Sequence, residues 1–141
     1  MPGPLAVLDA NVLFPFQLRN FLLHAAARGI FEPLWSRDIL DEVARHLPGK
    51  AGLTEAQVRH LFAQMERAFP DAFGAGYTHL IGEVELPDPD DRHVLALAVH
   101  YEAEFLVTSN LADFPADVLH PLGVEPLDPM RSWNAWRAPA A

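Results

Sequence analysis

Short apolar runs alternate with helical patterns along most of this 141-residue chain. The clearest runs are residues 5–8 and 105–108, which have the length and composition of buried strands. Between the runs lie segments whose apolar residues recur three or four positions apart, as they do in helices that cover a sheet. This alternation predicts an α/β sandwich around a parallel sheet, in which ligands bind beyond the carboxyl ends of the strands.

The expected elements fall into strands, helices and one linker inside a single domain spanning residues 1–141. Strands are expected at residues 5–8, 31–35, 81–84, 105–108 and 124–127. Helices are expected at residues 16–28, 36–47, 54–69 and 88–102, with a short one after Pro115 and a last turn holding Trp133 and Trp136. Residues 48–52, which contain proline and glycine, are expected to link two of these helices.

Composition excludes several classes of protein. The chain has no cysteine, so a disulfide scaffold and thiolate metal sites are ruled out, and a reducing cytoplasm is a compatible location. No apolar run approaches the roughly 20 residues that cross a bilayer. The net charge of −9 disfavours unspecific nucleic-acid binding, although divalent ions at an acid cluster would invert the local charge. The same charge suits a basic partner protein.

Acidic residues occur where expected strands end and expected helices begin. Asp9 follows the first strand, and Asp113 lies just past residues 105–108. Asp91 stands in the first turn of a helix that should cover the sheet, and Glu42 lies within another such helix. If the two strands are neighbours, these four carboxylates approach one another at one edge of the sheet.

Four converging carboxylates repel one another and require compensation. Mg²⁺ prefers oxygen ligands and is held by a few carboxylates together with substrate phosphate. Two such ions can activate a water and stabilise the leaving oxygen in phosphodiester cleavage. The joint placement of the acids therefore predicts a site for hard divalent cations.

Each acid also has a purely structural interpretation. Asp88, Asp90 and Asp91 are suitable residues for a helix N-terminus, where carboxylates cap backbone N–H groups. Glu42 can pair with His46 one turn later. No histidine pair has zinc-site spacing, and glycine-rich phosphate loops and serine nucleophile elbows are absent from the sequence. Only the combination of the four acids favours the metal site over helix capping.

Four blocks of sequence, in order, resemble the PIN-domain ribonucleases and within them the toxins of the VapC type. The blocks are "LDANVLF", "LWSRDILDEVARHL", "PDPDDRHVLALAV" and "FLVTSNLADFP". The resemblance implies a Rossmann-like three-layer sandwich with a parallel sheet of about five strands flanked by helices. It also implies endonucleolytic cleavage of RNA that depends on Mg²⁺ or Mn²⁺ and yields a 5′-phosphate and a 3′-hydroxyl.

The resemblance also assigns roles to residues of this sequence. The acidic constellation would be Asp9, Glu42, Asp91 and Asp113, with Asp91 preferred over its neighbour Asp90 by alignment alone. Asp9, Asp91 and Asp113 would bind one or two ions, while Glu42 would hold the attacking water or a second ion. The accessory residues would be Asn11, which supports Asp9 through its amide, together with Asp90 and Asn110. Relatives of this type commonly form homodimers and are silenced by an antitoxin.

The sequence also offers candidates for contact with the substrate, and three alternative functions remain open. Arg45 and Lys50 are the candidates for contact with substrate phosphate. A housekeeping RNA-processing nuclease without an antitoxin would have the same active site. A PIN-like binding module without catalysis would not need the intact set of acids. A phosphoryl-accepting receiver domain would need a lysine at a strand end, whereas Lys50, the single lysine, lies outside the expected strands.

Overall fold

The computed structural model describes residues 3–50 and 52–130, and among these the side chains of residues 48–50 are not described. Strands and helices alternate over this range, as the sequence predicts. The strands are β1 (Leu5–Leu8), β2 (Glu32–Ser36), β3 (Phe73–Gly74), β4 (Phe105–Val107) and β5 (Glu125–Leu127). The α-helices are α1 (Ala10–Leu13), α2 (Phe16–Ala27), α3 (Arg37–Lys50), α4 (Glu55–Ala68), α5 (Arg92–His100) and α6 (Ala116–Leu119). Four 3₁₀ helices are η1 (Thr78–Glu83), η2 (Pro89–Asp91), η3 (Leu111–Asp113) and η4 (His120–Leu122).

The five strands form one parallel sheet in the order β3-β2-β1-β4-β5. The chain moves outward from β1 to β3 and then returns to β4 on the other side of β1. Strand order therefore reverses between β1 and β4, which is where ligands bind in open α/β sheets. This arrangement confirms the expected fold class, including the number of strands.

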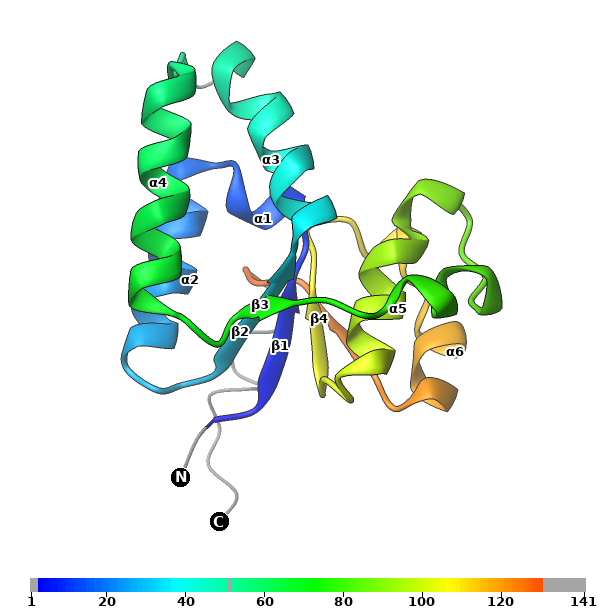
Figure 1. Ribbon diagram of the computed structural model, residues 1–141. Coiled ribbons are helices and arrows are strands. Elements are labelled where there is room, and N and C mark those ends of the chain that lie inside the picture. Colours follow the sequence, from blue (N-terminus) through cyan, green and yellow to red (C-terminus); the bar gives the residue numbers. More distant parts are fainter. Residues whose placement is uncertain (1–2, 51, 131–141) are drawn as a thin grey trace.

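Helices cover both faces of the sheet (Figure 1). The pair α2 and α4 lies on one side, α5 and α6 lie on the other, and α3 rises beyond the upper edge in this view. Because the sheet is covered on both faces, its central strands carry almost continuous apolar sequence. Ala6, Val7 and Leu8 of β1 are fully buried, as are Leu106 and Val107 of β4.

Local sequence sets the starts of three helical segments. The Ser36 hydroxyl accepts a hydrogen bond from the Ile39 N–H at 3.1 Å and caps α3. Thr54 and Gln57 form the expected reciprocal capping box at the start of α4. Asp88 accepts a hydrogen bond from the Asp90 N–H, but it caps η2, and α5 itself begins only at Arg92. The helix expected over residues 88–102 is thus shorter, with a 3₁₀ first turn.

The strand expected at residues 81–84 is wrong. Residues Thr78–Glu83 form η1, which packs against α5, and the third strand is the two-residue β3 further back in the chain. Val84 and Leu86 are buried and alternate with exposed Glu85, which gave that part of the chain its strand-like pattern. The strand β3 forms by pairing with Trp35 and Ser36, the last two residues of β2. This pairing is a tertiary effect and has no local sequence signal.

The linker expected at residues 48–52 is also wrong in part, because α3 continues to Lys50. A proline in the last turn of a helix removes one N–H donor but leaves the preceding turns intact, so it did not end the helix where expected. The turn expected to hold Trp133 and Trp136 lies outside the described residues. In the part of the chain that the structure describes, no helix combines the length and apolar character that a membrane crossing requires.

Leu106 provides a test of the core. It is fully buried at the centre of β4, so Leu106→Ala should lower the free energy of unfolding by about 2–5 kcal/mol. Leu122→Ala, at a side chain that is 42% exposed, should cost much less. Urea unfolding of both variants checks this, and equal losses would contradict the assigned burial.

Candidate active site

Asp9 occupies the carboxyl end of β1, and only 5% of its surface is exposed. Its backbone N–H continues the β1–β4 pairing by donating to the Val107 carbonyl at 3.0 Å. Oδ1 accepts a hydrogen bond from the Ala10 N–H at 2.8 Å, and Oδ2 accepts one from the Thr108 hydroxyl at 3.0 Å. Asp9 therefore caps α1 with one oxygen and is held against the end of β4 by the other.

The Thr108 side chain forms hydrogen bonds with several residues around Asp9, a role that the sequence did not predict. It is fully buried, and its hydroxyl oxygen accepts from the Asn11 side-chain amide at 3.0 Å and from the Asn110 N–H at 3.1 Å. Asn11 Oδ1 in turn accepts from the Ser109 N–H at 3.0 Å. Asn11 thus supports Asp9 indirectly, through Thr108. A polar residue placed directly after an apolar strand was the signal that could have revealed it.

Asp91 faces the other acids from the start of α5. The pKa of its carboxyl is raised to about 7, mainly by burial and then, in decreasing order, by the negative charges of Asp9, Asp113, Asp88 and Glu42. Burial is also the main reason that the pKa of Asp9 rises to about 6; its hydrogen bonds from Thr108 and Ala10 oppose this shift. The four predicted acids therefore lie within electrostatic reach of one another.

The structure distinguishes Asp91 from Asp90. Asp91 is half-buried, and its Oδ2 is a buried oxygen without a hydrogen-bond partner. Asp90 is exposed, and its backbone N–H is capped by Asp88. Helix periodicity alone could not separate the two, whereas their burial does.

The accessory residues take different positions. The Asn110 amide donates to Asp113 Oδ2 at 2.8 Å, so it orients that carboxylate. Glu42 lies on α3, where its backbone carbonyl contacts the His46 ring at 2.9 Å and His46 stacks on Phe14. The ring thus binds the Glu42 backbone, and in the described residues no ion pair joins the two side chains.

Of the two candidates for phosphate contact, Arg45 is exposed on α3, and the side chain of Lys50 is not described. The charges of Arg45, Asp38, Glu42 and Asp90 all act on His93, which is partly buried in α5. Arg45 therefore lies at the rim of the acidic region, beside residues from both α3 and α5.

The donor set fits a hard cation with an incomplete protein shell. Carboxylate oxygens are the ligands that Mg²⁺ prefers, and the unpartnered Oδ2 of Asp91 belongs to this set. Among the described residues, no three acidic, histidine or cysteine side chains lie close enough to surround one ion. An ion here would take the rest of its ligands from water and substrate, as Mg²⁺ commonly does.

A family model described as the PIN domain matches residues 6–112, a range that begins in β1 and ends beside Asp113. The chain belongs to the PIN-domain family. The match covers about three-quarters of this PIN-domain chain and includes β1 to β4, the strands that carry Asp9 and Thr108.

Relatives and solved structures are similar to this PIN domain. "Putative ribonuclease VapC50" of Mycobacterium tuberculosis is 47% identical over 58 residues, which make up 41% of this chain and 34% of that protein. This chain thus aligns with about a third of that relative's length.

Two crystal structures share the fold at low sequence identity. VapBC2 from Rickettsia felis, bound to a DNA fragment from its promoter, has a TM-score of 0.59 and 18% identity, covering 88% of this chain and 99% of that one. FitAcB from Neisseria gonorrhoeae has a TM-score of 0.57 and 13% identity, covering 89% and 99%.

The raised pKa of Asp9 predicts how stability depends on pH. A shift from 3.8 to about 6 means that the folded state binds the proton more tightly, at a cost of about 3 kcal/mol when the carboxyl is ionised. This part of the stability is present below pH 4 and is lost as pH rises to about 7. Asp9→Asn should therefore gain stability relative to the parent across that interval.

Urea unfolding in EDTA at pH 4 to 8 measures this difference. Asp71→Asn, at an exposed turn, is the control and should show no comparable pH-dependent gain. If the free energy of unfolding of the parent protein instead rose relative to that of Asp9→Asn as pH rises, the assignment of a buried carboxyl repelled by other acids would be contradicted.

Thr108→Val should lower the free energy of unfolding by about 1–3 kcal/mol, because Asp9 loses a buried partner and Asn11 and the Asn110 N–H lose partly buried ones. Thr108→Ser keeps the hydroxyl and should lose much less. Thermal or urea unfolding compares the two variants. Equal losses would mean that the methyl group, rather than the hydrogen bonds, carries the contribution.

Proposed function

We propose that this PIN-domain protein is a metal-dependent endoribonuclease and the toxin of a toxin–antitoxin pair. The observation that carries the proposal is the group of four mutually repelling carboxylates at the point where strand order reverses. Burying such charges destabilises the fold, and a function that uses them explains why they are there. The named ribonuclease relative supports RNA as the substrate.

In this proposal Asp9, Asp91 and Asp113 would hold one or two Mg²⁺ or Mn²⁺ ions, whose remaining ligands are water and substrate oxygens. When bound, such ions neutralise the phosphate charge and make a water more acidic. Thr108 and the Ala10 N–H fix the Asp9 carboxylate, and Asn110 fixes that of Asp113. Ligands held in this way need little reorganisation when the substrate arrives.

Glu42 and the rim residues complete the proposed reaction. Glu42 would orient the water that attacks phosphorus and accept its proton. The new P–O bond forms as the bond to the 3′ oxygen breaks, and a proton passes to that oxygen, giving a 5′-phosphate and a 3′-hydroxyl. Arg45 at the rim binds a neighbouring phosphate of the strand, a role for which its exposed position is suited. No side chain becomes covalently attached to the RNA.

The proposed partner is an antitoxin with a basic inhibitory segment. Both structural neighbours are complexes named for toxin–antitoxin pairs, VapBC2 and FitAcB. An arginine inserted among the four acids would neutralise them, since its planar fork matches carboxylates. The net charge of −9 favours such an encounter, and the active form is proposed to be a homodimer.

RNA cleavage tests the proposal directly. Mixed structured and unstructured RNA should be cut in the presence of Mg²⁺ or Mn²⁺, and EDTA should stop the reaction. Asp9→Asn should reduce the rate at least about 100-fold, because it removes the negative charge of a metal ligand while keeping a side chain of nearly the same size and shape. Asp71→Asn is the matched control, with the same chemical change at an exposed turn.

Two results would contradict the proposal. One is metal-dependent cleavage that survives in well-folded Asp9→Asn, which would overturn the assignment of Asp9 to the active site. The other is the absence of cleavage of every RNA tested together with no effect of Mn²⁺ on thermal stability. The second result would favour a PIN-like binding module.

A further inference from the structure

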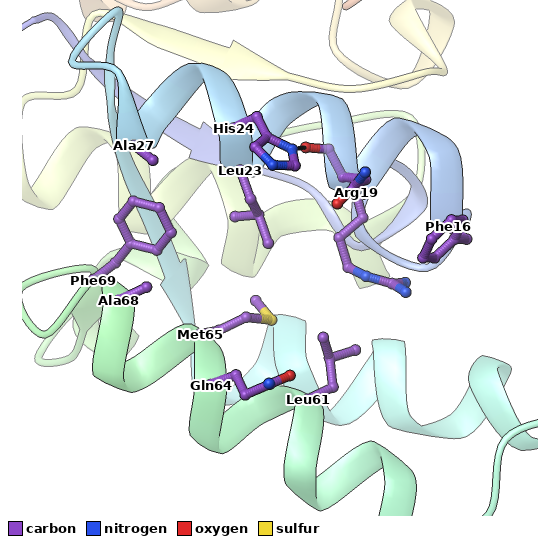
Figure 2. A pocket seen from close by; sticks show the side chains of 11 residues that line it. Phe16, Arg19, Leu23, His24, Ala27, Leu61, Gln64, Met65, Ala68 and Phe69 are labelled. Atoms are coloured by element: carbon purple, nitrogen blue, oxygen red, sulfur yellow. Dashed lines mark hydrogen bonds between the residues drawn. The ribbon is translucent and has the colours of Figure 1, made fainter.

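The turn between α1 and α2 presents an aromatic ring to solvent. It consists of Phe14, Pro15 and Phe16, and we call it the α1–α2 corner. The Phe16 side chain is 67% exposed, and no other phenylalanine, tyrosine or tryptophan among the described residues is more exposed. Figure 2 shows its ring at the end of α2, beyond Arg19. The reaction proposed above makes no use of this ring.

Hydrogen bonds hold the α1–α2 corner in place. Arg19 is only 7% exposed, and its Nη1 donates to the carbonyls of Leu13 at 2.9 Å and Phe14 at 3.2 Å. Its backbone N–H donates to the Pro15 carbonyl at 2.9 Å. The guanidinium also lies over one face of the Phe16 ring, 5.7 Å from the ring centre. The ring is therefore held before any ligand arrives, and its other face is the one that a ligand can reach.

The α1–α2 corner lies beside two acids of the candidate active site. Helix α1 starts from its N-cap Asp9 and has four residues, so the corner follows Asp9 after roughly 6 Å of helical rise. On the other side Phe14 stacks on His46, with ring centroids 4.9 Å apart and an interplanar angle of 12°. The His46 ring in turn contacts the carbonyl of Glu42, one turn earlier on α3, at 2.9 Å. Phe16 thus stands next to the place where the proposed substrate would be cleaved.

The chain around the α1–α2 corner lacks the negative charge that would repel a nucleic acid. Although the protein has 19 acidic residues, residues 10–31 contain none, and they include Arg19 and Arg28. Arg45, next to His46 in the sequence, is exposed on α3. Since phosphate repulsion weakens nucleic-acid binding, a strand leaving the four acids would meet the least repulsion along this acid-free segment.

We propose that the exposed face of the Phe16 ring stacks on an unpaired base of the RNA, beside the bond that is cleaved at the four acids. Every base has a flat π-face, so stacking on an aromatic side chain binds single strands with little sequence preference. Bases in a duplex are already stacked on one another, so the contact favours single-stranded stretches and loops. The inference rests on the proposed nuclease function, to which it adds a base-binding subsite and a substrate class.

Binding of a short RNA separates this contact from catalysis. Asp9→Asn, in which cleavage should be slow, is titrated in Mg²⁺ against a fluorescent unpaired RNA of about twelve nucleotides, and anisotropy is recorded. Adding Phe16→Ala should weaken binding at least about fivefold, because one base–aromatic stack is lost, whereas Phe16→Trp should preserve it. Phe73→Ala, the same change at a half-exposed ring on the edge strand β3, is the control and should alter affinity less than about twofold.

Kinetics give a second measurement in the active protein. Phe16→Ala should raise the KM for cleavage of the same RNA at least about fivefold and leave kcat nearly unchanged, because the contact holds the bound substrate and the transition state alike. Phe73→Ala should change neither constant. Thermal unfolding checks that each variant is folded.

An abasic strand identifies the part of the RNA that contacts the ring. An RNA of the same length without bases keeps every phosphate, so it should bind Asp9→Asn more weakly than the normal strand does. Phe16→Ala should then have no further effect, because the two changes remove the same contact. A fully paired duplex of the same sequence should be equally insensitive to Phe16→Ala.

Three results would overturn the inference and leave the nuclease intact. In the first, binding and KM respond to Phe16→Ala no more than to Phe73→Ala. In the second, Phe16→Ala weakens binding of the abasic strand as much as that of the normal strand, so the ring contacts no base. In the third, Phe16→Ala leaves RNA binding unchanged but abolishes self-association in sedimentation, which would assign the ring to a protein interface. Absence of both RNA binding by Asp9→Asn and cleavage by the parent protein would contradict the nuclease itself, and the inference with it.

Discussion

The parallel pairing of β1 with β4 fixes the candidate active site. In this pairing Val7 lies opposite Leu106 and Leu8 opposite Val107, so the next residues, Asp9 and Thr108, emerge together from the carboxyl edge. The hydrogen bond from Thr108 to Asp9 then joins two residues that are 99 positions apart in the chain. A shift of one residue in this register would turn every side chain of one strand to the other face and separate the pair. The β1–β4 pairing therefore fixes the relative position of Asp9 and Thr108.

Rigidity at this edge comes with an electrostatic cost. Asp9 and Asp91 both have raised pKa values because they are partly or fully withdrawn from water and face other acids. The remaining hydrogen bonds at the site orient these charges without neutralising them. A ligand of positive charge would stabilise the folded state and the arrangement of acids at the same time, which couples binding to stability.

Charge is also unbalanced in the opposite sense at Arg19 of α2, which is only 7% exposed. Its guanidinium donates to the backbone carbonyls of Leu13 and Phe14, and within the described residues no carboxylate forms an ion pair with it. The molecule thus has two regions whose buried charges lack a counter-charge within the described residues, one acidic and one basic.

The sequence by itself determined the fold class and most element positions, and it singled out the four acids as candidates for the site. Strand length, helix periodicity and capping residues such as Thr54 act over a few positions, and a sequence displays them directly. The resemblance to PIN domains favours Asp91 over Asp90 as the candidate ligand, a distinction that helix periodicity does not make. Tertiary structure alone decided the two-residue strand β3, the 3₁₀ helix η1 and the central position of Thr108, since each depends on a neighbour far away in the chain. It also decided that Arg19 is buried without a counter-charge, because burial is a property of the packed helices and not of the residues that form them.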